Sequence, residues 1–164
     1  MSWLNLFGFN KKSLELSVKF RKLSSEARTP KYANQGDAAM DLVALTRNMS
    51  SSFIEYGTGI AIEIPDGYVG LLFPRSSITK TPKGVSLKNS VGVIDSSYRG
   101  EILVRFNWPY PLITSPKEYE NMPKIGDKIA QLVILPYPKI KMKEVTELSD
   151  TSRGDGGFGS TDKK

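Results

Sequence analysis

Short apolar segments with alternating polar residues, separated by clusters of glycine, proline, asparagine and serine, constrain this 164-residue chain most strongly. Residues 60–64 and 102–106 each place an apolar side chain at every second position. Such alternation predicts strands with one buried face, because successive side chains of a strand point to opposite faces of a sheet. No window shows three turns of convincing helical periodicity. The sequence therefore predicts an all-β fold, a jelly-roll-like barrel or sandwich.

Further segments fit the same pattern. Apolar residues alternate from Leu14 through Leu16 and Val18 to Phe20, which predicts a first strand with one buried face. Strands are also predicted at residues 68–73, after a turn at residues 65–67, and at residues 129–135. A last strand is predicted to start at Ile140 and Met142. Residues 108–123 hold four prolines and are predicted to form an irregular loop.

The predicted domain organisation is simple. We expect an N-terminal extension at residues 1–12, one β domain at residues 13–150, and a flexible C-terminal arm at residues 151–164. The length suffices for one domain with a substantial core. No segment approaches the run of 18 or more apolar residues that predicts a membrane-spanning helix, so no membrane association is expected.

The absence of cysteine and histidine limits the chemistry further. It excludes Ser-His and Cys-His nucleophile pairs, zinc sites built from those residues, and redox thiols. A general base must then be Asp, Glu, Lys or Tyr, and a metal cofactor should be a hard cation such as Mg²⁺ bound to phosphates. The net charge of +6 suits an anionic partner. No block of five or six like charges exists, so nucleic-acid binding is not expected.

Residues 153–161 read Arg-Gly-Asp-Gly-Gly-Phe-Gly-Ser-Thr and cannot form a core. Glycines let backbone N–H groups turn toward phosphate oxygens, and an arginine offers a fork of donors to the same atoms. These are suitable groups for binding a phosphorylated, planar ligand. A frayed terminus would show a similar composition, so the segment alone leaves both interpretations open.

Three more segments carry polar residues suited to a site. Residues 89–102 contain a carboxylate and an aromatic side chain between glycines, a pattern that an ordinary β-hairpin would also explain. Residues 74–77 place an arginine beside two serines after a strand, where they could bind an anion or simply cap a helical turn. Residues 126–132 place Gln131 inside an apolar strand, where its amide joins either a core network or a polar site.

In order and spacing, these segments resemble the five motifs of the homotrimeric dUTP pyrophosphatases (dUTPases). The motifs correspond to residues 38–42, 74–77, 89–102, 126–132 and 153–161, and the resemblance runs from about Leu14 to the end. Residue 39 is alanine and residue 162 is aspartate where the family usually has glycine. The loop between the third and fourth motifs is longer than usual.

The resemblance implies that Mg²⁺-bound dUTP is cleaved to dUMP and pyrophosphate by water attacking the α-phosphorus. This reaction limits uracil incorporation into DNA and supplies dUMP. Asp95 is the expected catalytic base, which agrees with a chain that lacks histidine. Tyr98 would lie against the deoxyribose and exclude a 2′-hydroxyl. Asp41 would order the site, reaching Mg²⁺ through water, with no direct protein ligand expected for the metal.

The remaining roles are also implied by the resemblance. Uracil and deoxyribose would be bound by Asn89, Gly92, Val93, Ile94, Asp95, Tyr98, Leu103 and Phe158. Phosphate oxygens would be bound by Arg75, Ser76, Ser77, Gln131, Arg153, Ser160 and Thr161. The arm would close over the nucleotide, with Phe158 stacking on uracil, and each site would draw on three subunits of a homotrimer. We expect the enzyme in the cytoplasm, or in the host-cell cytoplasm if it is viral.

Two other function classes remain as alternatives. A dCTP deaminase resembles this family in fold, but that relative lacks the glycine-rich ending at residues 153–161. A binding or regulatory protein could keep the nucleotide site as a switch, with a protein partner at residues 108–123 or at the N-terminus. Ammonia release from dCTP, or partner binding without turnover, would distinguish these alternatives.

Overall fold

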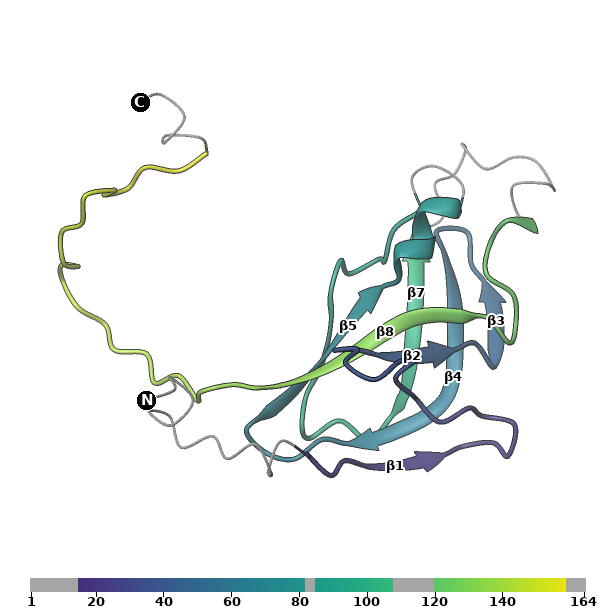
Figure 1. Cartoon of the computed structure of the whole chain (residues 1–164). Coiled ribbons are helices and arrows are strands. Elements are labelled where there is room, and N and C mark those ends of the chain that lie inside the picture. Colours follow the sequence, from purple (N-terminus) through teal and green to yellow (C-terminus); the bar gives the residue numbers. More distant parts are fainter. Residues whose placement is uncertain (1–14, 82–84, 108–119, 159–164) are drawn as a thin grey trace.

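A computed structural model of the chain describes residues 15–81, 85–107 and 120–158, and the strands within these ranges form two antiparallel sheets (Figure 1). The first sheet holds β1 (Lys19–Lys22), β3 (Thr46–Met49), β4 (Phe53–Glu63) and β7 (Glu101–Asn107). The second sheet holds β2 (Met40–Val43), β5 (Tyr68–Pro74), β6 (Gly92–Ile94) and β8 (Lys128–Pro136). The predicted all-β, jelly-roll-like class is confirmed.

Strand β4 is the centre of the first sheet. Its first half pairs with β3 and its second half with β1, while β7 pairs along its other edge. The pairing with β7 changes register between Gly57 and Ala61, so the residues between them bulge out of the ladder. Inside this bulge the Thr58 hydroxyl donates to the Ile102 carbonyl at 2.9 Å and accepts from the Ile60 N–H at 3.2 Å. Side-chain hydrogen bonds thus replace part of the lost ladder.

Strand β8 lies between β2 and β5 in the second sheet, and β6 follows at the edge. Gln131 of β8 is therefore the direct partner of Asp41 in β2 on one side and of Phe73 in β5 on the other. After β5 the chain turns at Arg75 into a short 3-10 helix, η2 (Ser76–Lys80). Strands β2, β5 and β8, which are far apart in the sequence, therefore lie side by side in this sheet.

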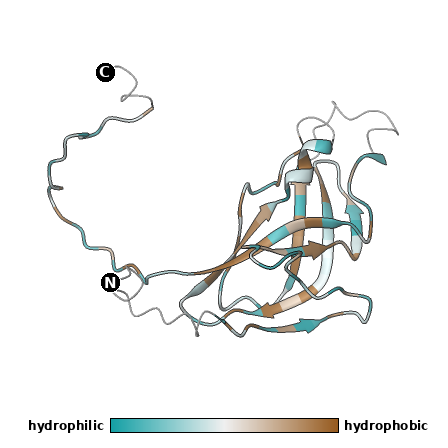
Figure 2. Ribbon diagram, viewed as in Figure 1, coloured by the Kyte–Doolittle hydropathy of each residue, from teal (hydrophilic) through white to brown (hydrophobic). Residues whose placement is uncertain are grey.

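The hydrophobic core is formed by buried side chains contributed by both sheets, and hydrophobic residues recur along their strands (Figure 2). Tyr56 and Phe106 are fully buried, and their rings meet edge to face with centroids 6.0 Å apart. The Tyr56 hydroxyl donates to the Pro123 carbonyl at 2.8 Å, so its polar end is also satisfied. Burying one such side chain stabilises the fold by roughly 1.5–3 kcal/mol. The core therefore fixes β4 against β7 and holds the strands of the two sheets in place.

Most predicted strands are present. Residues 60–64, 68–73, 102–106 and 129–135 fall in or beside β4, β5, β7 and β8, and the turn at residues 65–67 is closed by a hydrogen bond from the Tyr68 N–H to the Pro65 carbonyl. Ile102, Val104 and Phe106 of β7 are buried, while the residues between and beside them are exposed or partly so. Alternation predicted these strands correctly because each has one face on the core.

Two strand predictions are wrong. The first predicted strand begins only at Lys19, its four residues are all exposed, and Leu16 and Phe20 are 39% and 47% exposed. Strand β1 is an edge strand that pairs only with β4, so this chain does not cover its apolar side chains; Leu14 lies outside the described residues. The strand predicted at Ile140 and Met142 is not formed either, and these side chains are 72% and 86% exposed.

Beyond β8, residues 137–158 extend away from the two sheets as an arm (Figure 1). The root of this arm is tied to the β4–β5 turn by a hydrogen bond from the Tyr137 N–H to the Gly67 carbonyl and by an ion pair of Lys139 with Asp66 at 3.0 Å. The predicted extension at residues 1–12 and most of the predicted loop, residues 108–119, lie outside the described residues. None of the helices in the described ranges is long and apolar enough to span a membrane.

Candidate active site

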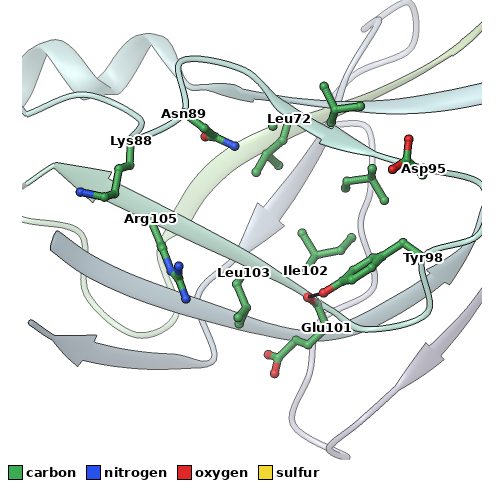
Figure 3. A pocket seen from close by; sticks show the side chains of 12 residues that line it. Leu72, Lys88, Asn89, Asp95, Tyr98, Glu101, Ile102, Leu103 and Arg105 are labelled. Carbon is green, nitrogen blue, oxygen red and sulfur yellow. Dashed lines mark hydrogen bonds between the residues drawn. The ribbon is translucent and has the colours of Figure 1, made fainter.

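A cavity of about 440 Å³ is lined by β6, the turn after it, and β7 (Figure 3). Seven of the eight residues predicted to bind uracil and deoxyribose line this one cavity: Asn89, Gly92, Val93, Ile94, Asp95, Tyr98 and Leu103. Strand β6 pairs with β5 on one edge and ends the second sheet on the other. Backbone groups along an unpaired edge are available to a ligand. The cavity therefore combines an unpaired strand edge with a carboxylate and an aromatic side chain.

Backbone hydrogen bonds fix the segment that carries Asn89. Leu87 forms an isolated bridge with Phe106 of β7, and the Lys88 N–H donates to the Arg105 carbonyl at 2.8 Å. Ser90 then adopts a positive φ of 58°, a conformation that costs energy for a residue with a side chain. This tight turn holds Asn89 at the cavity wall.

The turn between β6 and β7 carries both Asp95 and Tyr98. It is closed by a hydrogen bond from the Tyr98 N–H to the Asp95 carbonyl at 3.0 Å, and the Tyr98 hydroxyl donates to the Glu101 carbonyl at 2.9 Å (Figure 3). Arg99 closes the turn further by donating to the Ser96 and Tyr98 carbonyls. These bonds keep the Tyr98 ring folded back along its own turn, while the Asp95 carboxylate stays exposed.

Gly100 is required by the packing of the Tyr98 ring. A Cβ at residue 100 would lie only 2.4 Å from the Tyr98 hydroxyl oxygen and 2.6 Å from the ring carbon that bears it. Contacts this short are not tolerated in packed proteins. A side chain at position 100 would therefore displace the ring from the cavity wall.

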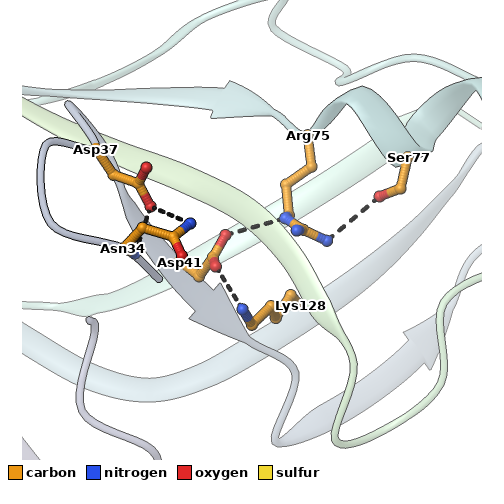
Figure 4. A network of polar contacts seen from close by, with 6 residues as sticks. All are labelled: Asn34, Asp37, Asp41, Arg75, Ser77 and Lys128. Carbon is orange, nitrogen blue, oxygen red and sulfur yellow. Dashed lines mark hydrogen bonds and ion pairs between the residues drawn. The ribbon is translucent and has the colours of Figure 1, made fainter. Parts of the chain in front are cut away.

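A second cavity of about 430 Å³ is lined by Arg75 and Gln131, two of the residues predicted to bind phosphate, and by Asp41, which was predicted to order the site. The Asp41 carboxylate is 7% exposed and accepts two charge-assisted bonds, from Arg75 Nε at 3.0 Å and from Lys128 Nζ at 2.7 Å (Figure 4). Arg75 also donates through Nη1 to Ser77 Oγ at 3.4 Å. Asp41, Arg75 and Ser77 thus form one network, and Gln131 faces the same cavity.

The electrostatics of this network favour a charged Asp41. Burial raises the pKa of the Asp41 carboxyl, but its hydrogen bond with Lys128 and the charges of Arg75 and Lys128 outweigh that effect. The pKa is therefore held below its usual value. Arg75 remains 28% exposed, so its guanidinium still has donors available to an anion entering the cavity.

Sequence reasoning missed several residues at both cavities. Lys128 contacts Asp41 directly, although strict alternation in β8 would place it on the opposite face from Gln131. The pairing of β2 with β8 changes register between Leu42 and Val43, which brings Lys128 within reach, and this irregularity leaves no signal in the sequence. In the first cavity the residues not predicted are Leu72, Lys88, Glu101, Ile102 and Arg105.

Of the predicted arm residues, the structure describes Arg153 and Phe158, and it brings neither of them to either cavity. Phe158 is fully exposed, and Arg153 donates through Nε to the Gly156 carbonyl at 2.9 Å within the arm itself. Ser160, Thr161 and Asp162 lie outside the described residues. Ser76 begins helix η2 and is exposed. It directly follows Arg75, which lines the second cavity.

Alanine at position 39 is compatible with the local backbone. Ala39 lines the second cavity and is not among the described residues with a positive φ. Glycine is therefore not needed there for a left-handed conformation.

The described residues offer limited donors for a metal ion. Within the described ranges, no three or more acidic side chains cluster in a way that could hold a cation. Asp41 has carboxylate oxygens of the kind that Mg²⁺ prefers, but each of them already accepts a bond from a cationic side chain. This donor set fits a Mg²⁺ ion that brings its own phosphate ligands and meets the protein through water.

Comparison with known proteins identifies relatives along nearly the whole chain. A family model described as dUTPase matches residues 25–162. A deoxyuridine 5′-triphosphate nucleotidohydrolase of Corynebacterium glutamicum is 44% identical over 149 residues, which cover 90% of this chain and 95% of that protein. An enzyme of the same description from a Hydrogenobaculum species is 40% identical over 149 residues, covering 88% of this chain and 96% of the relative.

Solved structures give the same result. The dUTPase of Staphylococcus bacteriophage 80alpha, solved with dUpNHpp, superimposes with a TM-score of 0.72 at 27% identity, covering 88% of this chain and 97% of that one. A mutant dUTPase from phage phi11 of S. aureus superimposes with a TM-score of 0.64 at 25% identity, covering 80% of this chain and 98% of that one. The second structure is described as revealing the coordination of a structural Mg(II) ion.

Proposed function

This chain belongs to the dUTPase family, and we propose that it hydrolyses dUTP to dUMP and pyrophosphate with Asp95 as the catalytic base. The activity itself rests on the family and on relatives that are about 40% identical over most of the chain. The observation that carries the assignment of residues is the gathering of seven predicted nucleoside-binding residues in one cavity. The reaction would limit uracil incorporation into DNA and supply dUMP.

Recognition of the base would use the unpaired edge of β6. Its backbone N–H and C=O groups, together with the Asn89 amide, offer donors and acceptors to the pairing edge of uracil. Cytosine reverses a donor and an acceptor on that edge and would leave buried polar groups unpaired. By analogy with other hydrogen-bonding sites, such a mismatch costs a factor of about 10⁴. The site should therefore prefer dUTP strongly over dCTP.

Recognition of the sugar would use the Tyr98 ring. The ring is held by the hydrogen bond of its hydroxyl to the Glu101 carbonyl and packs closely over Gly100. A ring fixed in this way cannot move aside for a 2′-hydroxyl, and steric overlap discriminates against the larger sugar. Leu103 lines the same wall from β7.

The bond changes are a single displacement at phosphorus. The Asp95 carboxylate takes a proton from a water molecule, whose oxygen forms a bond to the α-phosphorus. The bond from the α-phosphorus to the bridging oxygen of the β-phosphate breaks, and pyrophosphate leaves with that electron pair. Asp95 is exposed at the end of β6, in a chain that contains no histidine to act in its place.

The phosphate groups would be bound by Arg75, Ser76, Ser77 and Gln131. Arg75 is pre-oriented by Asp41, which leaves other guanidinium donors for phosphate oxygens. When bound to the triphosphate, Mg²⁺ would neutralise negative charge and polarise the phosphoryl oxygens. Asp41 would meet that ion through water, since both of its oxygens are engaged by Arg75 and Lys128.

A homotrimer with shared sites is part of this proposal. The nucleoside cavity and the phosphate cavity of one chain share no lining residue. The arm that carries Arg153 and Phe158 leads away from the two sheets (Figure 1), and neither residue lines either cavity. A complete site would then combine the nucleoside cavity of one subunit, the phosphate residues of another, and an arm, and Ser160 and Thr161 would join Arg153 on the phosphates. The arm residues should become ordered only when ligand contacts offset roughly 1–2 kcal/mol per residue of lost backbone entropy.

The direct test is to incubate the protein with each nucleoside triphosphate and Mg²⁺ and to measure pyrophosphate and ammonia. We expect pyrophosphate from dUTP and at least about 10³-fold less from dCTP, dTTP and UTP. Ammonia release from dCTP would contradict the proposal and favour a deaminase. No product from any nucleotide would favour a binding or regulatory role.

A further inference from the structure

The bulge in β4 leaves the Gly59 N–H without a partner in the β4–β7 ladder. Gly59 has a φ of +66°, and a Cβ there would lie 2.5 Å from Leu45 Cδ2 and 2.8 Å from the Ala27 Cβ. Only glycine fits this conformation in this space. The backbone at residue 59 is therefore forced into a shape that the ladder cannot satisfy, and another group must accept its hydrogen bond.

The side chain of Glu101 supplies that acceptor. Its Oε1 accepts the Gly59 N–H at 2.6 Å, a short, charge-assisted bond. The space for the carboxylate exists because residue 57 is also glycine: a Cβ on Gly57 would lie 2.7 Å from Glu101 Oε1. Two glycines of β4 thus accommodate one carboxylate from β7. The Thr58 hydroxyl satisfies the rest of the bulge by bonding to the Ile102 carbonyl and the Ile60 N–H.

The backbone of the same residue holds the cavity wall. The Glu101 carbonyl accepts the Tyr98 hydroxyl at 2.9 Å, and Glu101 itself lines the nucleoside cavity (Figure 3). Glu101 also pairs with Ala61, and with this pair the β4–β7 ladder resumes after the bulge. One residue therefore joins the bulge in β4 to the aromatic ring that faces the sugar.

We propose that Glu101 is a positioning residue for nucleotide selection: its carboxylate clamps the β4 bulge and thereby fixes the carbonyl that holds the Tyr98 ring. This inference rests on the proposed role of Tyr98 at the sugar. Glu101 does not contact the reacting atoms; it acts through Tyr98. Loss of the clamp should loosen the ring, so UTP is admitted more readily and dUTP is bound more weakly, while the chemical step changes less.

Three substitutions separate the clamp from the charge. Glu101→Gln keeps an oxygen that can accept the Gly59 N–H but removes the charge. Glu101→Met keeps a similar length and removes the acceptor. Glu101→Asp keeps the charge but shortens the side chain by one bond, about 1.5 Å, so that it no longer reaches Gly59. All three variants keep Gly57 and Gly59, the glycines of the bulge.

The experiment uses the full chain and two independent measurements. Amide hydrogen exchange at Gly59 reports the clamp without any nucleotide, and kcat and KM for dUTP and UTP report selection. For Glu101→Met and Glu101→Asp we expect Gly59 to exchange about tenfold faster and the dUTP:UTP ratio of kcat/KM to fall about tenfold, chiefly through KM. Glu101→Gln should stay within about threefold of wild type in both.

The outcomes distinguish the clamp from the proposed function. Unchanged Gly59 exchange in Glu101→Asp would overturn the clamp, and faster exchange with an unchanged dUTP:UTP ratio would overturn its role in selection. If Glu101→Gln were as impaired as Glu101→Asp, an uncharged acceptor within reach of the Gly59 N–H would not preserve the clamp, which also contradicts the proposal. Should Glu101→Met fail to fold, Glu101→Asp decides. A wild-type protein that does not cleave dUTP would refute the proposed function, while the exchange data would still test the clamp.

Discussion

Asp41→Asn should destabilise the protein measurably, because Asp41 is a buried anion that pairs with both Arg75 and Lys128. The substitution keeps the size of the side chain and removes its charge. It weakens the bonds from Arg75 Nε at 3.0 Å and from Lys128 Nζ at 2.7 Å, and leaves two cations close together without an anion between them. The expected effect is therefore larger than for an ordinary surface ion pair.

The magnitude follows from the exposure of the partners. A hydrogen bond to a charged group contributes about 1.5–3 kcal/mol. Asp41 accepts two, but Arg75 and Lys128 are 28% and 46% exposed, so solvent screens both, and we take about half of the full sum. This gives a loss of about 1.5–3 kcal/mol in the free energy of unfolding. For a domain of this size, such a loss lowers the melting temperature by about 3–12 °C.

The same reasoning predicts how the stability difference between wild type and Asp41→Asn changes with pH. The pKa of Asp41 is lowered in the folded protein. Its stabilising contribution is therefore fully present above the pKa of the unfolded chain, about 3.9, and is lost as pH falls through the lower folded pKa. Thermal unfolding of wild type and Asp41→Asn should differ most near neutral pH, and the difference should shrink below about pH 4.

The matched control is Asp66→Asn. Asp66 pairs with Lys139 at 3.0 Å, and its pKa is also lowered, but both side chains are 72% exposed. Solvent screening should make this substitution neutral in the same assay. Two results would show that the ion pairs of Asp41 do not stabilise the fold. One is that Asp41→Asn melts no lower than Asp66→Asn, and the other is that Asp41→Asn lowers the melting temperature relative to wild type equally at pH 3 and at pH 7.

Three further predictions concern the site. Tyr98→Ala should raise kcat/KM for UTP relative to dUTP by at least about tenfold, and an unchanged ratio would argue against a steric gate at the sugar. Truncation before Arg153 should leave the melting temperature and oligomeric state intact while dUTP turnover falls at least about 10²-fold; full activity would exclude a closing arm. Chelation of Mg²⁺ should stop pyrophosphate release without changing the melting temperature, whereas a lower melting temperature would indicate a structural metal.

The strands that pack one face on the core could be read from the sequence. In β7, the buried Ile102, Val104 and Phe106 alternate with outward-facing residues, so burial and periodicity agree. The edge strand β1 misled the same reasoning, because Phe20 has the right spacing but no cover from this chain. Periodicity indicates that a face is apolar and says nothing about what covers it.

Most of the nucleoside cavity was predictable because its residues lie close together in the sequence. Asn89, Asp95 and Tyr98 lie on the segments that flank β6, within residues 89–98, so local chain geometry brings them together although β6 and β7 belong to different sheets. Lys128 and Glu101 were not predicted as contributors. Lys128 reaches Asp41 through a register shift between β2 and β8, and Glu101 reaches Gly59 through the bulge in β4. The register shift between β2 and β8 depends on the pairing of the whole sheet and has no local signal in the sequence. The bulge in β4 does have a local signal, because glycine inside a strand, here Gly57 and Gly59, is typical of a bulge.

The role of Asp95 is tested most directly by single-turnover hydrolysis of dUTP with wild type and with Asp95→Asn, which keeps the shape of the side chain but cannot accept the proton from water. With a general base removed, the rate of pyrophosphate formation should fall by about 10²–10⁴, while dUTP still binds and the protein melts as wild type does. A variant that cleaves dUTP at the wild-type rate would contradict the account, since water would then be activated without this carboxylate.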